Sequence, residues 1–462
     1  MKYDVLVIGS GPGGYVAAIR AAQLKMNVAV VEKAELGGVC LNWGCIPTKA
    51  LLKSAKVYDL VRHAEDYGVS LDGEAGVNLE KMVDRSRSVA EGMSKGVQYL
   101  FKKNKIEVIK GSGRLKKKGV VEVDMDGEKK EFSADHIILA TGARASELPE
   151  IKIDGEKVIS YRQAMILREQ PGSMIVIGSG AIGSEFAHFF NSIGTKVTLV
   201  EFLPAVVPNE DGEVSKQLER SFKKSGMKVL TSSSVESVDT GGDKCIAHVK
   251  TKKGMEEIEA DIVLSAVGVK PNIEDIGLEE NDVKTEKGKI IVDDYYRTNV
   301  EGVYAIGDIV HGPALAHVAS AEAIICIEKI AGLEVEALDY NNVPACTYTS
   351  PEVASVGYTE EAAREKGYEI KVGKFPFTAG GKASAEGARE GFVKLIFDAK
   401  YGELLGAHMI GAGVTEMISE IVVARKLETT AHEIIKSVHP HPTMSEAVME
   451  AAAAAYDEVI HL

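Results

Sequence analysis

The sequence predicts an α/β protein in which two doubly wound parallel sheets are followed by a C-terminal α+β domain. Three observations predict this arrangement: two similar glycine-rich segments, a later apolar strand that closes each of them, and a final third that has no such segment. A chain of 462 residues also exceeds the roughly 250–300 residues that one hydrophobic core supports, so about three domains are expected.

The first glycine-rich segment begins as an apolar strand at Tyr3, continues as a helix to Lys25 and closes with a second strand that ends at Glu32. Its strand and helix are joined by a G-x-G-x-x-G pattern made of Gly9, Gly11 and Gly14. An apolar run, a glycine turn and an amphipathic stretch in this order are typical of a strand–turn–helix–strand unit.

The second segment repeats this order. An apolar strand from Ser173 leads into a helix to about Ile193, and a strand over 196–200 ends at Glu201. The same G-x-G-x-x-G pattern is made of Gly178, Gly180 and Gly183. In both segments the first glycine precedes the closing acid by 23 residues (9 to 32 and 178 to 201).

The chemistry of a dinucleotide explains this spacing. The first glycine permits the tight turn, the second lets a pyrophosphate approach the backbone, and the third lets helix and strand pack closely. The positive end of the helix faces the phosphates, and the acid accepts hydrogen bonds from the adenosine ribose. One such pattern is weak support, but two of them, each with its acid, predict two Rossmann-like dinucleotide-binding domains.

Two further apolar strands support the duplication. Residues 137–142 follow Asp135 and residues 262–268 follow Asp261, so each strand is placed to close its own unit. An extended run over 297–308 then ends in Gly-Asp, which puts the carboxylate of Asp308 at the C-terminal end of a strand, where ligands of open α/β sheets bind.

The final third, from about Asn341, carries no nucleotide motif. Strand-like pieces over 392–397 and 404–410 alternate with amphipathic helices over 415–426 and 443–456. This pattern predicts a separate α+β domain.

Composition excludes several classes. A net charge of −14 leaves no basic surplus for a nucleic acid. No apolar stretch approaches the about 20 residues of a membrane helix, and the strand at Tyr3 leaves no room for a signal peptide. A cytoplasmic, reduced chain is therefore expected, in which the five cysteines do not form a disulfide framework.

Cys40 and Cys45 lie close in sequence, within a segment that also contains Gly44 and Pro47. On a regular helix their Cα atoms would be about 8.6 Å apart, whereas a disulfide needs roughly 4.4–6.8 Å. Gly44 and Pro47 are the residues expected to supply an irregular backbone. The other cysteines are scattered without metal-ligand spacing, so no metal site is predicted and the three are expected to be buried structural thiols. This leaves redox use for the pair.

The chain resembles the pyridine-nucleotide disulfide oxidoreductases of the glutathione reductase type over nearly all of its length. The resemblance is specific in the two glycine segments, in residues 38–49, in residues 298–308 and in residues 439–446. It implies four parts: an FAD-binding domain over 1–148, an NAD-binding domain over 149–270, a central FAD-contacting domain over 271–340 and a dimerisation domain over 341–462.

The resemblance also implies a role for each matched residue. FAD would be bound by the following residues: Gly9, Gly11, Gly14, Glu32, Lys49, Thr141, Gly142, Asp308 and Ala316. NAD would be bound by a second set: Gly178, Gly180, Gly183, Glu185, Glu201 and Gly268. Cys45 would be the thiol beside the flavin and Cys40 the outer thiol that exchanges with substrate, with Glu185 as the ion partner of Lys49.

Glu201 also bears on the choice of nicotinamide cofactor. Where a relative that uses NADP would place arginines, this chain continues from Glu201 as Phe-Leu-Pro-Ala-Val-Val-Pro. A carboxylate bonds the 2′-hydroxyl of NAD and repels the 2′-phosphate of NADP, so NAD is predicted.

Near the C-terminus, a histidine and a carboxylate five residues later form a candidate oriented base. The segment contains His439, His441 and Glu446. In the family the histidine directly before Pro-Thr is catalytic, which implies that His441 is the base, oriented by Glu446, and that His439 is auxiliary or structural. The resemblance further implies that this base serves the active site of the other subunit, so a homodimer is expected.

The implied reaction is oxidation of protein-bound dihydrolipoamide to lipoamide with reduction of NAD⁺. The partner would be a lipoyl-bearing protein of a 2-oxo acid dehydrogenase complex or of the glycine cleavage system. Glu201 disfavours a glutathione reductase, the absence of a terminal cysteine pair disfavours a mercuric reductase, and Cys40 disfavours a soluble transhydrogenase. The alternative from another class is a component that binds flavin and NAD but has little activity of its own.

Overall fold

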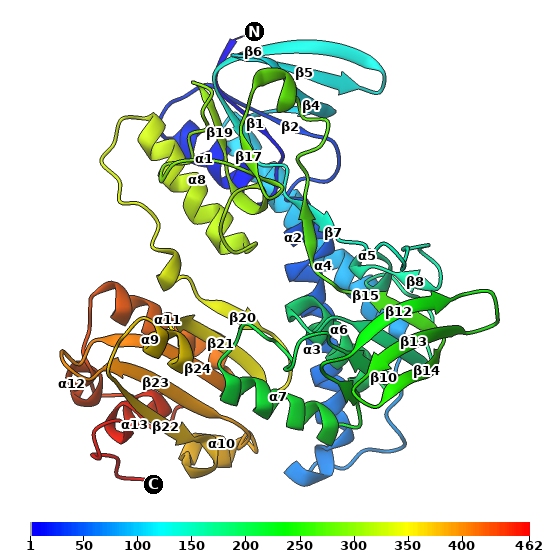
Figure 1. The fold of residues 1–462 in the computed structure, drawn as a ribbon, viewed down its shortest axis with the longest axis vertical. Helices are drawn as coiled ribbons and strands as arrows, with labels where there is room; N and C mark the ends of the chain where they lie inside the picture. Colours follow the sequence, from blue (N-terminus) through cyan, green and yellow to red (C-terminus); the bar gives the residue numbers. More distant parts are fainter. Residues whose placement is uncertain (1) are drawn as a thin grey trace. The chain divides into compact units, whose positions relative to one another are not determined.

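The computed structural model describes residues 2–462 (Figure 1). The chain divides into two compact units. Unit 1 contains the residues up to Leu51, Glu80–Ser146 and Val269–Leu338. Unit 2 contains Leu52–Leu79, Glu147–Gly268 and Asp339–Leu462. The segments expected to bind FAD thus cluster with the central segment, and the NAD-binding segment clusters with the C-terminal domain. The four-part division with its boundaries stays a prediction.

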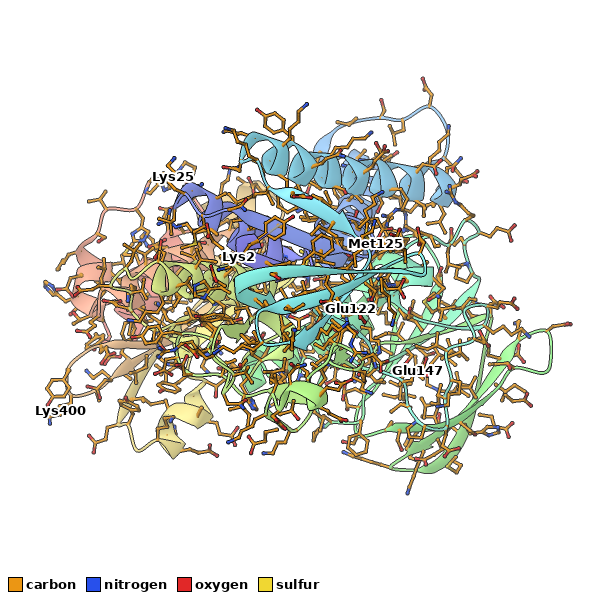
Figure 2. All side chains as sticks on the ribbon, turned by 90° about the horizontal axis from the view of Figure 1, so that it is seen from above. Lys2, Lys25, Glu122, Met125, Glu147 and Lys400 are labelled. Atoms are coloured by element: carbon orange, nitrogen blue, oxygen red, sulfur yellow. The ribbon has the colours of Figure 1, made fainter. Side chains whose placement is uncertain are left out.

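Unit 1 is built on a seven-stranded sheet of order β3-β2-β1-β6-β5-β4, with β19 paired to β6. The strands are β1 (Lys2–Ile8), β2 (Val28–Glu32), β3 (Glu107–Lys110), β4 (Ser112–Lys117), β5 (Val120–Met125), β6 (Glu128–Leu139) and β19 (Val303–Ala305). β1 is parallel to both β2 and β6, as the doubly wound prediction requires. β4, β5 and β6 are antiparallel, and Glu122 and Met125 lie on this edge hairpin (Figure 2).

Unit 1 contains several helices, two of which pack together through small residues. They are α1 (Pro12–Gln23), α2 (Gly38–Trp43), the start of α3 (Cys45–Arg62), α4 (Leu79–Lys103) and α8 (Ala316–Ile330). Ala17, Ala18 and Ala21 of α1 are fully buried in one cluster with Ala323 and Cys326 of α8. Short side chains let the two helices approach closely, which gives the glycine turn before α1 a rigid support.

Unit 2 contains a second parallel sheet, of order β11-β10-β9-β15-β8, and a three-stranded antiparallel sheet, β12-β13-β14. The strands of the parallel sheet are β8 (Val158–Ile159), β9 (Ser173–Ile177), β10 (Lys196–Val200), β11 (Lys228–Leu230) and β15 (Ile262–Ser265). The antiparallel strands are β12 (Ser234–Asp239), β13 (Cys245–Thr251) and β14 (Gly254–Ala260). The helices are α5 (Tyr161–Ala164), α6 (Ala181–Ser192) and α7 (Gly212–Lys224). The second doubly wound unit is confirmed.

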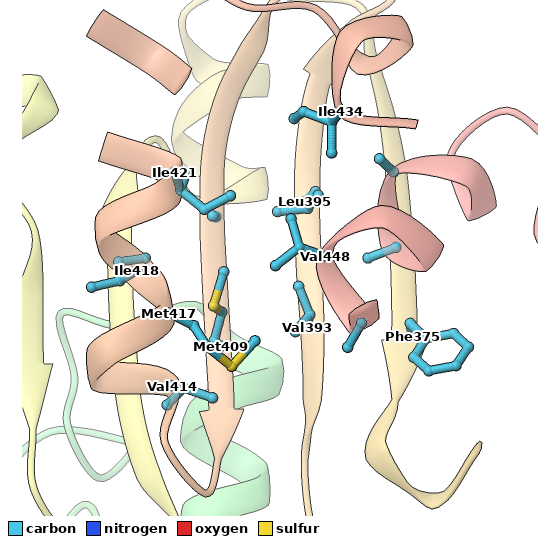
Figure 3. Packing of buried hydrophobic residues seen from close by; sticks show 14 of the residues in the cluster. Phe375, Val393, Leu395, Met409, Val414, Met417, Ile418, Ile421, Ile434 and Val448 are labelled. Atoms are coloured by element: carbon cyan, nitrogen blue, oxygen red, sulfur yellow. The ribbon is translucent and has the colours of Figure 1, made fainter. Parts of the chain in front are cut away.

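The C-terminal part of unit 2 is a five-stranded antiparallel sheet of order β20-β21-β24-β23-β22 with helices on it, which confirms the α+β prediction. Its strands are β20 (Ala345–Thr347), β21 (Glu352–Gly357), β22 (Ile370–Pro376), β23 (Phe392–Asp398) and β24 (Leu404–Gly411). The helices are α9 (Glu360–Glu365), α10 (Gly381–Ala385), α11 (Val414–Lys426), α12 (Ala431–Lys436) and α13 (Glu446–Ala454). Val393, Leu395 and Met409 of the sheet form one apolar core with Ile418 of α11 and Val448 of α13 (Figure 3).

Several predicted elements differ from the observed ones. β6 is not a short strand at 137 but begins at Glu128, because its first half pairs with β5 as a hairpin. In the run over 297–308 only Val303–Ala305 is a strand, and Gly307–Ile309 form a 3₁₀ turn. The last helix begins at Glu446 rather than at 443 and ends at Ala454.

Candidate functional site

The first glycine turn has the geometry that a pyrophosphate requires. Gly9 has φ = 104°, and a Cβ there would lie 2.3 Å from the carbonyl oxygen of Ala140. A Cβ on Gly14 would lie 1.9 Å from the carbonyl oxygen of Gly9, so only glycine permits this helix–strand contact. Gly11, by contrast, is the N-cap of α1 and has open space where its Cβ would be. The open position and the helix N-terminus together form a cradle for an anion.

The second turn repeats these values. Gly178 has φ = 96°, and its Cβ would lie 2.5 Å from the carbonyl oxygen of Ala266. A Cβ on Gly183 would lie 1.9 Å from the carbonyl oxygen of Gly178, and a Cβ on Gly180, the N-cap of α6, would again have nothing within 4 Å. Neither helix N-terminus has a side-chain cap, so no side chain occupies the position where a phosphate would bind.

The two closing acids are bound to the turns by a serine that the sequence analysis did not single out. Glu32 Oε2 accepts hydrogen bonds from the Ser10 N–H at 2.9 Å and from its Oγ–H at 2.6 Å. Glu201 Oε2 accepts the same two bonds from Ser179, at 2.8 and 2.7 Å. The recurrence of serine at the second position of both glycine patterns was the signal that could have revealed this contact.

The remaining residues expected to bind FAD lie in unit 1. Asp308 is in the 3₁₀ turn after β19, and burial raises the pKa of its carboxyl while Lys289 opposes the shift. No hydrogen-bond partner of this carboxyl is found within residues 2–462, and its role in binding FAD stays a prediction. Thr141 follows β6 and donates to the Asn272 carbonyl at 2.6 Å, while Ala316 begins α8.

Gly142 and Gly268 lie beyond the ends of β6 and β15. Both have positive φ, 67° and 113°, and both have open space where a Cβ would be. A side chain at either position would need a strained backbone and would fill space at the carboxyl edge of its sheet, where ligands of such sheets bind.

The two sulfurs of the candidate redox pair are in contact. Gly44 ends α2 with φ = −142° and ψ = −115°, and α3 starts directly at Cys45, so the helix is broken between the cysteines. A hydrogen bond with Cys45, together with burial, raises the pKa of the Cys40 thiol, while the nearby Lys49 ammonium lowers it. Both side chains are thiols here; Cys45 is exposed and Cys40 is half-buried.

The expected source of the irregular backbone is correct for Gly44 and wrong for Pro47. Pro47 lies in the first turn of α3, where its missing N–H has no intrahelical partner to lose and the helix continues undisturbed. The Pro47 carbonyl accepts a hydrogen bond from the buried Ser86 at 2.9 Å, which ties the start of α3 to α4.

The three other cysteines are not part of this redox pair. Cys245 and Cys326 are fully buried, as predicted, and burial raises the pKa of both thiols. Cys346 is only half-buried on β20, so the prediction of a buried thiol is wrong there, because β20 is an edge strand.

Lys49 and Glu185 were expected to pair. Lys49 lies one turn after Cys45 on α3, and Glu185 is buried on α6, where it accepts a hydrogen bond from the Tyr348 N–H at 3.0 Å. The ion pair itself stays a prediction.

The candidate base lies before α13. The ring nitrogen Nδ1 of His441 is 2.9 Å from Glu446 Oε1, and Oε2 of the same carboxylate accepts the Thr443 N–H at 2.8 Å. Burial opposes ionisation of Glu446, but the bonds from Thr443 and His441 outweigh it and lower its pKa. Because the carboxylate occupies Nδ1, the other ring nitrogen is directed away, and 76% of the His441 side chain is exposed.

His439 has a different environment. Its side chain is only 7% exposed, and its two ring nitrogens bond the Glu420 carboxylate at 2.9 Å and the Ser437 carbonyl at 3.0 Å. The hydrogen bond to Glu420 raises its pKa. Both nitrogens are therefore used within the fold, whereas His441 keeps one available.

Across residues 2–462, no group of three or more His, Cys, Asp or Glu side chains is arranged to hold a metal ion. No helix in the same range is long and apolar enough to cross a membrane.

Two dinucleotide cradles, a cysteine pair in contact and a carboxylate-oriented histidine define a class: a flavoprotein disulfide oxidoreductase. Residues 3–323 match the family model described as pyridine nucleotide-disulphide oxidoreductase, and residues 343–452 match its dimerisation domain. The chain belongs to this family.

Relatives with curated names match over the full length. A dihydrolipoyl dehydrogenase of Rhizobium etli is 48% identical, covering 100% of this chain and 99% of its own. One of Zymomonas mobilis is 49% identical, covering 99% of both chains. A solved structure, LpdA from Mycobacterium tuberculosis, has a TM-score of 0.90 at 28% identity and covers 97% of this chain and 98% of its own.

The cofactors of this protein are FAD and NAD, which fits the two cradles. The dimerisation domain makes the protein a homodimer of the family type. The expected fold class, enzyme class and cofactors are thereby confirmed.

Proposed function

We propose that the protein is a dihydrolipoyl dehydrogenase, which oxidises protein-bound dihydrolipoamide to lipoamide and reduces NAD⁺ to NADH. The observation that carries the proposal is the contact between the Cys40 and Cys45 thiols across the break at Gly44. A vicinal dithiol substrate needs an acceptor disulfide that can form a mixed disulfide and then be released as a dithiol, and this pair supplies one.

In the proposed reaction, the histidine acts as the base and the two cysteines accept the electrons of the substrate. His441 of one protomer takes a proton from a thiol of the substrate that is bound in the active site of the other protomer, because the thiolate is the nucleophile. The thiolate attacks Cys40 of the oxidised pair, Cys45 leaves as a thiolate, and the second substrate thiol then displaces Cys40. The substrate becomes a cyclic disulfide, and two electrons rest on the cysteine pair. FAD, when bound in the first cradle, would supply the two-electron redox chemistry that links the reduced cysteine pair to NAD⁺.

The other residues bind and orient. We assign the FAD pyrophosphate to the amide groups after Gly11 and the NAD pyrophosphate to those after Gly180. Glu32 and Glu201 would accept from the two adenosine riboses. Lys49 would keep a positive charge beside the cysteines, since its ammonium already lowers the Cys40 pKa.

The experiment is NAD⁺ reduction by the FAD-loaded dimer with dihydrolipoamide as the reductant. Cys40→Ser and Cys45→Ser should each abolish turnover while flavin absorbance at normal stoichiometry shows that FAD is retained. Cys245→Ala, in the three-stranded sheet, is the matched control and should keep turnover. A flavin-loaded wild type without dithiol-dependent NAD⁺ reduction would instead support a binding component with little activity.

We further propose that the physiological partner is a lipoyl-bearing protein in the cytoplasm, from a 2-oxo acid dehydrogenase complex or the glycine cleavage system. The full-length relatives named dihydrolipoyl dehydrogenase support a lipoyl substrate. Capture of lipoylated proteins from a lysate by the Cys45→Ser dimer, followed by mass spectrometry, separates the two systems.

A further inference from the structure

A basic hollow lies within unit 2, away from the second glycine turn. It has a volume of about 640 Å³ and lies between α7 and the β22–β23 edge of the C-terminal sheet. Five cationic and two carboxylate side chains line it, so its local charge is opposite in sign to that of the chain, which carries −14.

One wall of the hollow is a row of three cations on α7. Lys216, Arg220 and Lys224 are spaced by four residues, which places them about 6 Å apart on one helix face. All three are exposed. Within residues 2–462, no carboxylate lies within the 4.0 Å ion-pair distance of any of them. The three cations of the row therefore form no direct ion pair.

The two carboxylates of the hollow are bonded to groups other than this row. Glu213 pairs with Lys374 at 2.6 Å and with the buried Lys394 at 3.0 Å. Glu390 accepts a hydrogen bond from Ser221 at 2.5 Å. With five cations and two carboxylates, the lining keeps a positive net charge.

The opposite wall adds a cation and an apolar surface. Arg389 faces the hollow, and its guanidinium donates to the Thr378 carbonyl at 3.3 Å, which restrains it. The ring of Phe392 lies 5.2 Å from the Lys374 ammonium, and Pro376 is beside it. Phe392 and Pro376 thus add a small apolar surface to this wall.

We infer that this hollow is a binding site for a small polyphosphate anion of the nucleoside di- or triphosphate class. Successive phosphates carry closely spaced charges that match a row of ammonium and guanidinium groups, and guanidinium binds phosphate in a bidentate manner. The volume lies in the range of small-ligand sites, about 300–1,000 Å³. An extended acidic peptide would instead need a binding surface that is longer and flatter than this hollow.

This site is distinct from the assigned NAD site. The Gly180 cradle is at the N-terminus of α6, whereas the hollow uses the exposed face of α7 and the C-terminal sheet. A ligand there would bridge the nucleotide-binding part and the C-terminal part of unit 2, and would stabilise their contact by mass action.

The test is isothermal titration of the FAD-loaded dimer with inorganic tripolyphosphate and, separately, with ATP. Saturating NAD⁺ is present so that the Gly180 cradle is blocked. We expect saturable binding, one site per chain, that weakens as salt rises from about 0.05 to 0.3 M because the row is exposed. The double variant Lys216→Gln/Arg220→Gln should bind at least tenfold more weakly.

Lys223→Gln is the matched control, because Lys223 is on the same helix but pairs with Glu219 at 2.5 Å and does not line the hollow. It should bind tripolyphosphate as the wild type does. Circular dichroism and dithiol-dependent turnover, unchanged in both variants, would show that the fold is intact. Absent or non-saturating binding, equal loss in the control, or binding only of a tetraglutamate peptide would overturn the inference.

Discussion

Glu201 accepts two hydrogen bonds from Ser179, one from its backbone N–H at 2.8 Å and one from its Oγ–H at 2.7 Å. Its other oxygen accepts from the Leu203 N–H at 2.8 Å. Glu201, which follows β10, is thus oriented by the glycine turn that follows the neighbouring strand β9. Glu32 and Ser10 repeat the relationship in unit 1.

This orientation leads to the first prediction, a strong preference for NADH over NADPH. The fixed carboxylate would bond the 2′-hydroxyl and repel a 2′-phosphate. Glu201→Ala should lower kcat/KM with NADH by about tenfold, the cost of roughly 1.4 kcal/mol of lost charge-assisted hydrogen bonding. Ser179→Ala, which removes only the Oγ donor, should lose less. Comparable kcat/KM of the wild type with NADPH would contradict the assignment.

The second prediction contrasts two glycines three residues apart. Gly183→Ala would place a Cβ 1.9 Å from the Gly178 carbonyl oxygen and should destabilise the fold by several kcal/mol. Gly180→Ala meets no protein atom and should leave the melting temperature within about 2 °C. Its methyl group would nevertheless occupy the cradle, so the KM for NAD⁺ should rise about tenfold or more. Thermal unfolding and steady-state kinetics separate the two effects, and equal melting temperatures would refute the steric account.

The third prediction concerns the oriented base. His441→Gln should lower turnover with dihydrolipoamide by about 10²–10⁴-fold, because a positioned base contributes that much to proton transfer. Glu446→Gln should cost less, since the imidazole remains and only its orientation and charge partner change. His439→Gln is the control, and its effect should appear mainly in stability, because both of its nitrogens bond within the fold. Turnover near that of the wild type in His441→Gln would remove the histidine from the mechanism.

The fourth prediction is a dependence of stability on pH that originates at Glu210. Burial raises its pKa to about 7, the Asp211 charge adds to the shift and a bond with Ser355 opposes it. Its Oε2 is buried without a hydrogen-bond partner in the described chain. The folded state therefore binds the proton more tightly than the unfolded state, so this contribution to stability is complete below about pH 4.5 and is lost as pH rises through 7.

Glu210→Gln keeps the shape of the side chain and removes the titration. It should be more stable than the wild type at pH 8 by about 1–3 kcal/mol, and the difference should shrink towards pH 5. Urea unfolding of both proteins at the two pH values measures it. A pH-independent difference would mean that Glu210 is ionised in the fold.

Much of the site follows from local pattern. The glycine turns, their acids and the break between the cysteines occur where spacing predicts them, since a turn without a Cβ and a strand end are short-range properties. Pro47, the start of the last helix and the length of β6 were not predicted correctly. Pro47 lies in the first turn of α3, where the helix tolerates its missing N–H, and β6 is lengthened because its first half pairs with β5 in a hairpin.

By itself, the sequence determined the two dinucleotide units, the redox pair and the histidine before Pro442, because each is encoded in residues less than about 25 positions apart. Tertiary structure alone decided which ring nitrogen of His441 is available and which cations of α7 form no direct ion pair. These features depend on contacts between side chains of different elements, and the spacing of residues in the sequence does not give the distances between those side chains.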